Sequence, residues 1–216
     1  MSRFLRALLL VLGGAALVLA GRFILAWFTE RRRREVYPAS QAAALLNPLR
    51  ERLMPVEKTL DRFGVSSGQT VLEVGPGPGY YTLKASRRIG DSGRILCFDI
   101  QRGMLETLRS RLEDADVHNA DLVVADATHL PLATGCVDVA FLVTVLGEVP
   151  EPEAALAELR RVLKPGGRLG FGETMRDPDY VLLGRMRRMC RAQGFAEVAY
   201  YRELLGYTIT FRVPGA

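Results

Sequence analysis

The sequence is poor in the residues that build metal centres and disulfide frameworks. Its 216 residues include three cysteines and two histidines. Cys97, Cys136 and Cys190 are far apart and odd in number, which excludes a disulfide framework and a paired-cysteine zinc site. The two histidines, His118 and His129, are too few for a histidine-based metal centre. We therefore expect no metal and a reducing compartment.

The chain also lacks the composition of a disordered or repetitive protein. Hydrophobic residues make up 49% and charged residues 25% of it, and no internal repeat is visible. At roughly 100–200 residues per domain, this length predicts one domain with an appendage. We expect an N-terminal membrane anchor with a basic flank at 1–35, a helical lead-in or lid at 36–66, and the main domain at 67–216.

Most of the chain has no basic excess. Residues 1–35 contain seven arginines and two acidic residues, whereas residues 36–216 contain 22 basic and 22 acidic residues. A nucleic-acid-binding domain usually shows a basic patch or stripe. We therefore expect no nucleic-acid partner.

The arm at 1–35 contains one long apolar run. Ala7–Gly21 is apolar or small throughout, Arg22 interrupts the run, and residues 23–28 continue it. A helix over residues 7–28 is about 33 Å long, enough to cross a hydrocarbon core of ~30 Å. The sequence therefore predicts one transmembrane helix within residues 5–28.

The flanks of this run predict its orientation. Arg31–Arg34 follow the run, whereas Arg3 and Arg6 precede it. The excess of arginine after the span places the main domain on the cytoplasmic side of the membrane. Two alternatives stay open: a cleaved secretory signal that ends near Val18-Leu19-Ala20, and an interfacial helix.

After two short helical segments, at 41–46 and 56–63, apolar strands alternate with helices. The predicted strands are 71–74, 94–99, 121–125, 137–143 and 168–173, followed by an antiparallel pair at 195–201 and 207–213. The predicted helices are 80–88, 104–112, 152–163 and 180–193, and Lys164–Gly167 is the stop signal of the third. This alternation predicts an α/β fold with a mostly parallel sheet covered on both faces. Ligands of such sheets bind at the carboxyl ends of the strands.

A glycine-rich segment, Glu73–Gly79, follows the first of these strands. Gly75, Gly77 and Gly79 occupy alternate positions, a spacing that differs from the dinucleotide fingerprint and from the P-loop. The two prolines between them remove two N–H donors, which suits a ligand without phosphates better than a pyrophosphate.

Two acidic residues end the next two strands. A carboxylate at Asp99 can accept hydrogen bonds from both hydroxyls of a ribose. A carboxylate at Asp126 can accept one from an adenine amino group. Each alone would be an ordinary solvated aspartate, but together with Glu73 and the glycines they predict a nucleoside site.

On these motifs, residues 71–175 resemble class I S-adenosylmethionine-dependent methyltransferases of the type 11 group. The matching stretches are VLEVGPGPGYYT (71–82), ILCFDIQRGML (95–105), VVADATHLPL (123–132), VDVAFLVTVLGEVPEPEAALAELRRVLKPGGRLGFGE (137–173) and the closing GF…YTITF pattern. The resemblance implies a Rossmann-like sheet of seven strands, mostly parallel with the last antiparallel, and S-adenosyl-L-methionine as cofactor.

The resemblance also implies what individual residues do. By this resemblance, the methionine end of the cofactor would be held by Glu73, Gly75, Gly77 and Gly79. Asp99 would bind the ribose, and Ile100 would pack on the adenine. Asp126 and Ala127 would contact the adenine edge, and Leu142 and Val143 would line the methyl-transfer position. We further expect Tyr80, at the start of the first helix, to wall the site. For Tyr81 a core position is as plausible.

The sequence departs from its relatives just after the fourth strand. Many relatives have a His-Glu pair there, and this chain has Gly147-Glu148. Glu148 is the remaining candidate for a general base, and a solvent-facing acid at the start of a helix is the alternative interpretation.

No insertion is long enough to form a substrate domain, so we expect acceptor contacts from the 37–55, 143–151 and 174–181 segments. An anchored domain suits a small lipophilic or lipid acceptor that reacts through a thiol, amine or hydroxyl. A non-catalytic cofactor-binding membrane scaffold and a nucleotide-dependent oxidoreductase stay open as alternatives. The sequence names neither the acceptor atom nor the oligomeric state.

Overall fold

The computed structural model describes residues 22, 37–46, 51 and 54–215. The predicted anchor, apart from Arg22, lies outside the described residues. The chain divides into two compact units, Met1–Glu35 and Val36–Ala216. Within the described residues, no helix combines the length and the apolar character needed to cross a membrane.

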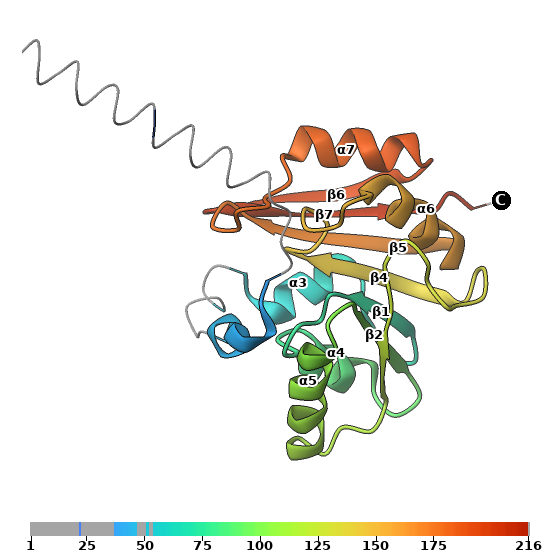
Figure 1. Cartoon of the computed structure of the whole chain (residues 1–216). Helices are drawn as coiled ribbons and strands as arrows, with labels where there is room; N and C mark the ends of the chain where they lie inside the picture. Colours follow the sequence, from blue (N-terminus) through green and yellow to red (C-terminus); the bar gives the residue numbers. More distant parts are fainter. Residues whose placement is uncertain (1–21, 23–36, 47–50, 52–53, 216) are drawn as a thin grey trace, which may run out of the picture. The chain divides into compact units, whose positions relative to one another are not determined.

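The second unit is a single sheet with helices on both faces (Figure 1). Its described elements are, in chain order, η1 (Ala39–Leu46), α3 (Val56–Phe63), β1 (Thr70–Val74), α4 (Thr82–Ile89), β2 (Arg94–Asp99), α5 (Arg102–Asp114), β3 (Ala120–Val124), β4 (Val137–Val143), α6 (Pro152–Val162), β5 (Leu163–Thr174), α7 (Leu183–Ala192), β6 (Ala196–Glu203) and β7 (Gly206–Arg212).

The sheet has seven strands in the order β3-β2-β1-β4-β5-β7-β6. The pairs from β3 to β5 are all parallel, and β7 is antiparallel to both of its neighbours, β5 and β6. The predicted Rossmann-like sheet, with its last strand antiparallel, is confirmed. The strand order reverses between β1 and β4, where such sheets bind their ligands.

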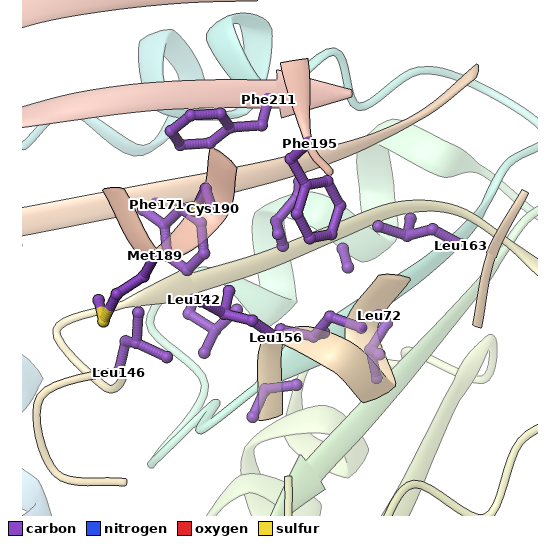
Figure 2. Close-up of a cluster of buried hydrophobic side chains, with 14 of the residues drawn as sticks. Leu72, Leu142, Leu146, Leu156, Leu163, Phe171, Met189, Cys190, Phe195 and Phe211 are labelled. Atoms are coloured by element: carbon purple, nitrogen blue, oxygen red, sulfur yellow. The ribbon is translucent and has the colours of Figure 1, made fainter. Parts of the chain in front are cut away.

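Alternation along the strands supplies two separate hydrophobic cores. In β1, Leu72 and Val74 belong to the core beneath α6 and α7, part of which Figure 2 shows, whereas Val71 belongs to the core beneath α3, α4 and α5. Side chains of successive strand residues point to opposite faces. A sheet buried on both faces therefore needs the nearly continuous apolar runs seen in β1 and β4.

Helix α3 packs closely on the sheet because β5 carries glycine beneath it. A Cβ atom at Gly170 would lie 2.3 Å from Cδ1 of Phe63. The Phe63 ring stacks on Phe141 of β4, with centroids 5.7 Å apart. Gly64, at φ 79°, ends the helix in the left-handed conformation that glycine adopts without strain. The helical lead-in thus packs directly on the main sheet.

Two predicted boundaries differ from the observed ones by three residues or more. Helix α6 ends at Val162, just before the predicted stop signal, but β5 begins at Leu163 and not at residue 168, because Leu163 already pairs with Val137 and the register shifts before Val139 pairs with Arg168. Helix α7 begins at Leu183 and not at residue 180.

The late start of α7 has a tertiary cause. The Val181 N–H donates to a carboxylate oxygen of Glu173, and the Val181 carbonyl accepts a hydrogen bond of 2.7 Å from the Tyr207 hydroxyl. The ring of Tyr180 packs edge-on against that of Tyr207. These contacts hold the segment before α7 in a non-helical conformation.

Candidate active site

A cavity opens at the carboxyl ends of β1, β2, β3 and β4. Its lining includes ten of the twelve predicted site residues: Glu73, Gly75, Gly77, Tyr80, Asp99, Ile100, Asp126, Ala127, Val143 and Glu148. The topology therefore brings together, at the carboxyl edge of the sheet, residues that whole strands and helices separate in the sequence. Among the described residues, no group of three or more His, Cys, Asp or Glu side chains is placed to hold a metal.

The glycine loop after β1 needs its glycines for two reasons. Gly75, Gly77 and Gly79 all have positive φ, at 69°, 54° and 84°, a region that other residues rarely adopt. A Cβ at Gly75 would lie 2.4 Å from Val145, whereas the Cβ position of Gly77 meets its first neighbour, Leu45, at 3.6 Å. Gly75 thus permits close packing, and Gly77 keeps the backbone open to a ligand.

Glu73 supports this loop from inside the sheet. Its side chain is 3% exposed and accepts a hydrogen bond of 2.7 Å from the Thr82 hydroxyl at the start of α4. A carboxylate fixed in this way presents a negative group to the cavity. Such a group suits the ammonium end of an amino-acid ligand.

Asp99 is a buried carboxylate held by backbone amides. Its Oδ1 accepts from the Gln101 N–H at 2.9 Å, and its Oδ2 accepts from the Gly77 N–H at 3.3 Å. Burial raises the pKa of Asp99, while these N–H groups and that of Ile100 oppose the rise. The carboxylate therefore joins the glycine loop to the start of α5 and faces the cavity with a fixed orientation.

Ile100 and Asp126 flank this carboxylate with different chemistry. Ile100 lines the cavity yet is 56% exposed, so an apolar surface is available for a flat ring to cover. Asp126 uses Oδ1 to accept hydrogen bonds from the N–H and hydroxyl of Thr128, which lower its pKa. Asp126 is therefore an ionised turn residue that also lines the cavity.

Gly79 and Leu142 do not line the cavity. A Cβ at Gly79 would lie 2.2 Å from Leu108, so this glycine makes room for α5. Leu142 is 1% exposed and belongs to the core beneath α6 and α7 (Figure 2). Strand alternation explains the difference, because Val143 points to the opposite face and does line the cavity.

The other wall of the cavity comes from segments that lie far apart in the sequence. Tyr37 and Leu45 come from the lead-in, Val149 and Pro150 from the loop after β4, and Asp177 from the loop after β5. These are the three segments from which acceptor contacts were expected. The individual residues were not predicted, since no local motif marks them.

Gln101 ties the lead-in to the site and was also missed. Its amide donates to the Tyr37 carbonyl at 2.8 Å and accepts from the Ala39 N–H at 3.3 Å. Tyr80 makes a second tie, because its hydroxyl donates to Glu51 at 2.9 Å. The one signal that could have pointed to Gln101 is its position two residues after Asp99.

Glu148 is a half-buried carboxyl group whose pKa is raised. Burial, helped by the negative charges of Asp177, Asp179 and Asp99, raises its pKa to about 7, although the Tyr37 N–H opposes this. The carboxyl group therefore exchanges its proton near neutral pH. Glu148 is partly buried and lines the cavity, which favours a role in the site over that of a solvent-facing acid.

The glycine before Glu148 explains the missing histidine. A Cβ at Gly147 would lie 1.8 Å from the backbone oxygen of Asp179. The loop after β5 thus occupies the space that any side chain at position 147 would need. Glu173, at the end of β5, lies behind this loop and is 2% exposed, and burial raises its pKa to about 8.

Comparison with known proteins agrees with this geometry. Residues 72–171 match the family model described as a methyltransferase domain. The chain is 39% identical over 124 residues to the ubiquinone/menaquinone biosynthesis C-methyltransferase UbiE of Haemophilus ducreyi, covering 56% of this chain and 48% of that protein. For UbiE of Azotobacter vinelandii, the identity is 41% over 129 residues, with 59% and 51% covered. The chain thus spans about half the length of these curated relatives.

Solved structures share the fold. A SAM-dependent methyltransferase from Aquifex aeolicus superposes with a TM-score of 0.78 at 24% identity, covering 82% of this chain and all of that one. The [4+2]-cyclase SpnF superposes with a TM-score of 0.67 at 20% identity, covering 74% and 80%. The fold alone therefore does not fix the reaction. Residues 72–171, a little under half of the chain, thus match a methyltransferase domain, and the chain shares its fold with a SAM-dependent methyltransferase.

Proposed function

We propose that this chain is a membrane-anchored methyltransferase that moves a methyl group from S-adenosylmethionine to a small lipophilic or lipid acceptor. The observation that best supports this proposal is the set of residues that line one cavity. It joins the nucleoside-type wall of Asp99, Ile100 and Asp126 to a second wall that contains Leu45, Val149 and the carboxyl group of Glu148.

The first wall, which we call the cofactor wall, suits S-adenosylmethionine. All three of its key residues line the cavity, where Asp99 would accept the ribose hydroxyls, Ile100 would pack on the adenine and Glu73 would face the methionine ammonium group. S-adenosylmethionine, when bound, supplies a methyl group that its sulfonium has already activated. The protein's own contribution is then mainly to fix donor and acceptor in line, which contributes a large part of the rate enhancement in such displacements.

The second wall, which we call the acceptor wall, supports an acceptor with an apolar body. Its described residues include Leu45, Val145, Val149 and Pro150. The curated relatives carry a name that refers to C-methylation in ubiquinone and menaquinone biosynthesis. Quinol-like phenols therefore belong among the compounds to test. A ring carbon should be considered as the methyl acceptor in addition to thiol, amine and hydroxyl groups.

Glu148 is the group we assign to proton removal. A carboxyl group with a pKa of about 7 is partly deprotonated at neutral pH and accepts a proton efficiently there. A phenol, a thiol or a ring carbon loses a proton when it is methylated. The Glu148 carboxylate would take that proton at the acceptor end of the cavity.

The membrane part of the proposal rests on the arm. Residues 5–28 would cross the bilayer, and the arginines after them would hold the methyltransferase domain on the cytoplasmic side. Carbonate extraction of membranes from cells that express the full chain tests this. Retention in the pellet, with the domain open to protease only in inverted vesicles, is expected, and release into the wash would contradict it.

Transfer of a radiolabelled methyl group tests the reaction itself. Full-length protein in nanodiscs would be given labelled S-adenosylmethionine and a panel of lipophilic quinols, thiols and amines, each with a water-soluble analogue. Label in the organic phase for a lipophilic compound, and much less for its soluble analogue, is expected. Equal turnover of both analogues would contradict the lipophilic acceptor, and no turnover across the panel would favour a cofactor-binding scaffold.

A further inference from the structure

A second surface, beside the cavity, combines exposed apolar side chains with arginines. It is formed by the loop after β5, the start of α7 and the turn between β6 and β7, and we call it the hairpin surface. Its exposed apolar residues are Met175, Leu182, Leu204 and Leu205. Leu204 is 87% exposed and Leu182 is 68% exposed, and it is their grouping with other exposed apolar side chains that suggests an interaction surface.

Hydrogen bonds show that these segments form one surface. The carbonyl of Leu205, in the hairpin turn, accepts from the Met175 N–H at 2.8 Å and from the Thr174 hydroxyl at 3.1 Å. The Tyr207 hydroxyl donates to the carbonyl of Val181, next to Leu182. In Figure 1 the hairpin turn lies at the edge of the sheet toward which β4 points, as the cavity does.

The exposed charged side chains of the hairpin surface are all arginines. Arg176, Arg185 and Arg202 are exposed, and none of them forms an ion pair with any described residue. The same segments contain three acidic residues: Glu203 pairs with Arg62 beneath the hairpin, Asp177 lines the cavity, and Asp179 lies against Gly147 of the loop after β4. The surface therefore presents leucines and a methionine among cationic side chains.

We infer that the hairpin surface docks on the headgroup region of an anionic lipid bilayer. Exposed leucines at a turn can enter the acyl boundary, while arginines beside them bind headgroup phosphates. Docking would add a second membrane contact, within the folded domain, to the one proposed for residues 5–28. It does not depend on methyl transfer.

Docking would also orient the cavity. Asp177 lines the cavity, and Met175, two residues before it, belongs to the hairpin surface. A bilayer on this surface would lie beside the acceptor wall. A lipophilic acceptor would then reach the cavity from the membrane, a consequence that rests on the proposed function, although the docking itself does not.

Depth-dependent quenching of a single tryptophan tests the docking. The chain has one tryptophan, so Trp27→Phe provides a dark background for Leu204→Trp in the full-length protein. Vesicles would contain phosphatidylglycerol and acyl-brominated phosphatidylcholine. The matched control is Ser92→Trp, at an exposed turn before β2. We expect a blue-shifted emission and bromine quenching at position 204, and neither at position 92.

Two arginine variants separate lipid docking from other contacts. Arg176→Gln with Arg202→Gln should reduce the quenching at position 204 to the level of position 92, whereas Arg212→Gln, at the other end of β7, should not change it. Absence of bromine quenching at position 204 overturns the inference. A blue shift that follows protein concentration and not lipid would also overturn it, by showing a second copy on this surface.

Discussion

The two walls of the cavity are assembled from different ranges of the sequence. On the cofactor wall, Asp99 ends β2 and Ile100 follows it, while Asp126 and Ala127 follow β3. On the acceptor wall, the lead-in, the loop after β4 and the loop after β5 meet only because the chain folds. A site for a common cofactor can be encoded in short strand-end motifs. The acceptor wall depends on tertiary packing, so it is where one member of such a fold can differ from another.

The sharpest way to separate the walls is Glu148→Gln. This change removes the proposed proton acceptor and leaves the cofactor wall intact, so kcat should fall by about 10²–10⁴-fold with an unchanged affinity for S-adenosylhomocysteine. Because the pKa of Glu148 is about 7, wild-type kcat/KM should rise with pH through that value. Steady-state kinetics between pH 5.5 and 8.5 would show both effects. A variant that keeps wild-type turnover and pH dependence would exclude Glu148 as the base.

Glu173→Gln probes the support behind the acceptor wall. The buried carboxyl group has a pKa of about 8 when folded, against about 4.5 when unfolded, so the folded state retains a proton that the unfolded state releases. Stability from this group is full below pH 4.5 and is lost as pH rises through 8. The difference in the free energy of unfolding between the variant and wild type should therefore shift by about 2–4 kcal/mol in favour of the variant when the pH is raised from 5.5 to 8. Urea unfolding at the two pH values measures this shift.

Glu197→Gln is the matched control for that experiment. The hydrogen bond from Arg187 lowers the pKa of Glu197, so its titration lies below this pH window. Its stability relative to wild type should not change between pH 5.5 and 8. A Glu173→Gln variant with the same pH slope as wild type would contradict a protonated, buried Glu173.

Gly147→Ala tests the explanation for the missing histidine. The added methyl group would overlap the Asp179 carbonyl, so we expect a loss of about 1–3 kcal/mol in the free energy of unfolding. Gly184→Ala, in α7, is the control, because its Cβ would meet nothing closer than 3.9 Å. That change should leave stability unaltered or raise it by up to about 1 kcal/mol. Equal melting temperatures for the two variants would show that the loop after β5 yields easily.

Ile100→Ala should produce the smallest effect, and on the cofactor wall alone. Loss of the apolar surface offered to the adenine should weaken S-adenosylhomocysteine binding about tenfold. Stability should change by less than about 0.5 kcal/mol, because the side chain is largely exposed. Val124→Ala, at a similarly exposed position at the end of β3, should bind like wild type. A tenfold loss for Val124→Ala as well would point to a general disturbance of the strand ends.

The same contrast explains which features could be predicted from the sequence. The strands, and the positions of Asp99, Ile100 and Asp126 in the cavity lining, were predictable because apolar runs and the residues that end them are local signals. Leu142 and Val143 were predicted together because the end of β4 is apolar on both faces, so the pattern does not show which of the two lines the cavity. The start of α7 and the need for glycine at 147 depend on contacts with Tyr207 and Asp179, which no local pattern records.

Calorimetric titration of S-adenosylhomocysteine into the full-length protein tests the central claim, that the cavity at the strand ends is the cofactor site. We expect micromolar binding that weakens by about 100-fold or more in Asp99→Ala, since a buried charged hydrogen-bond acceptor is lost. Asp114→Ala, at the exposed end of α5, should bind like wild type. Wild-type protein that does not bind, or Asp99→Ala protein that binds equally well, would contradict the assignment.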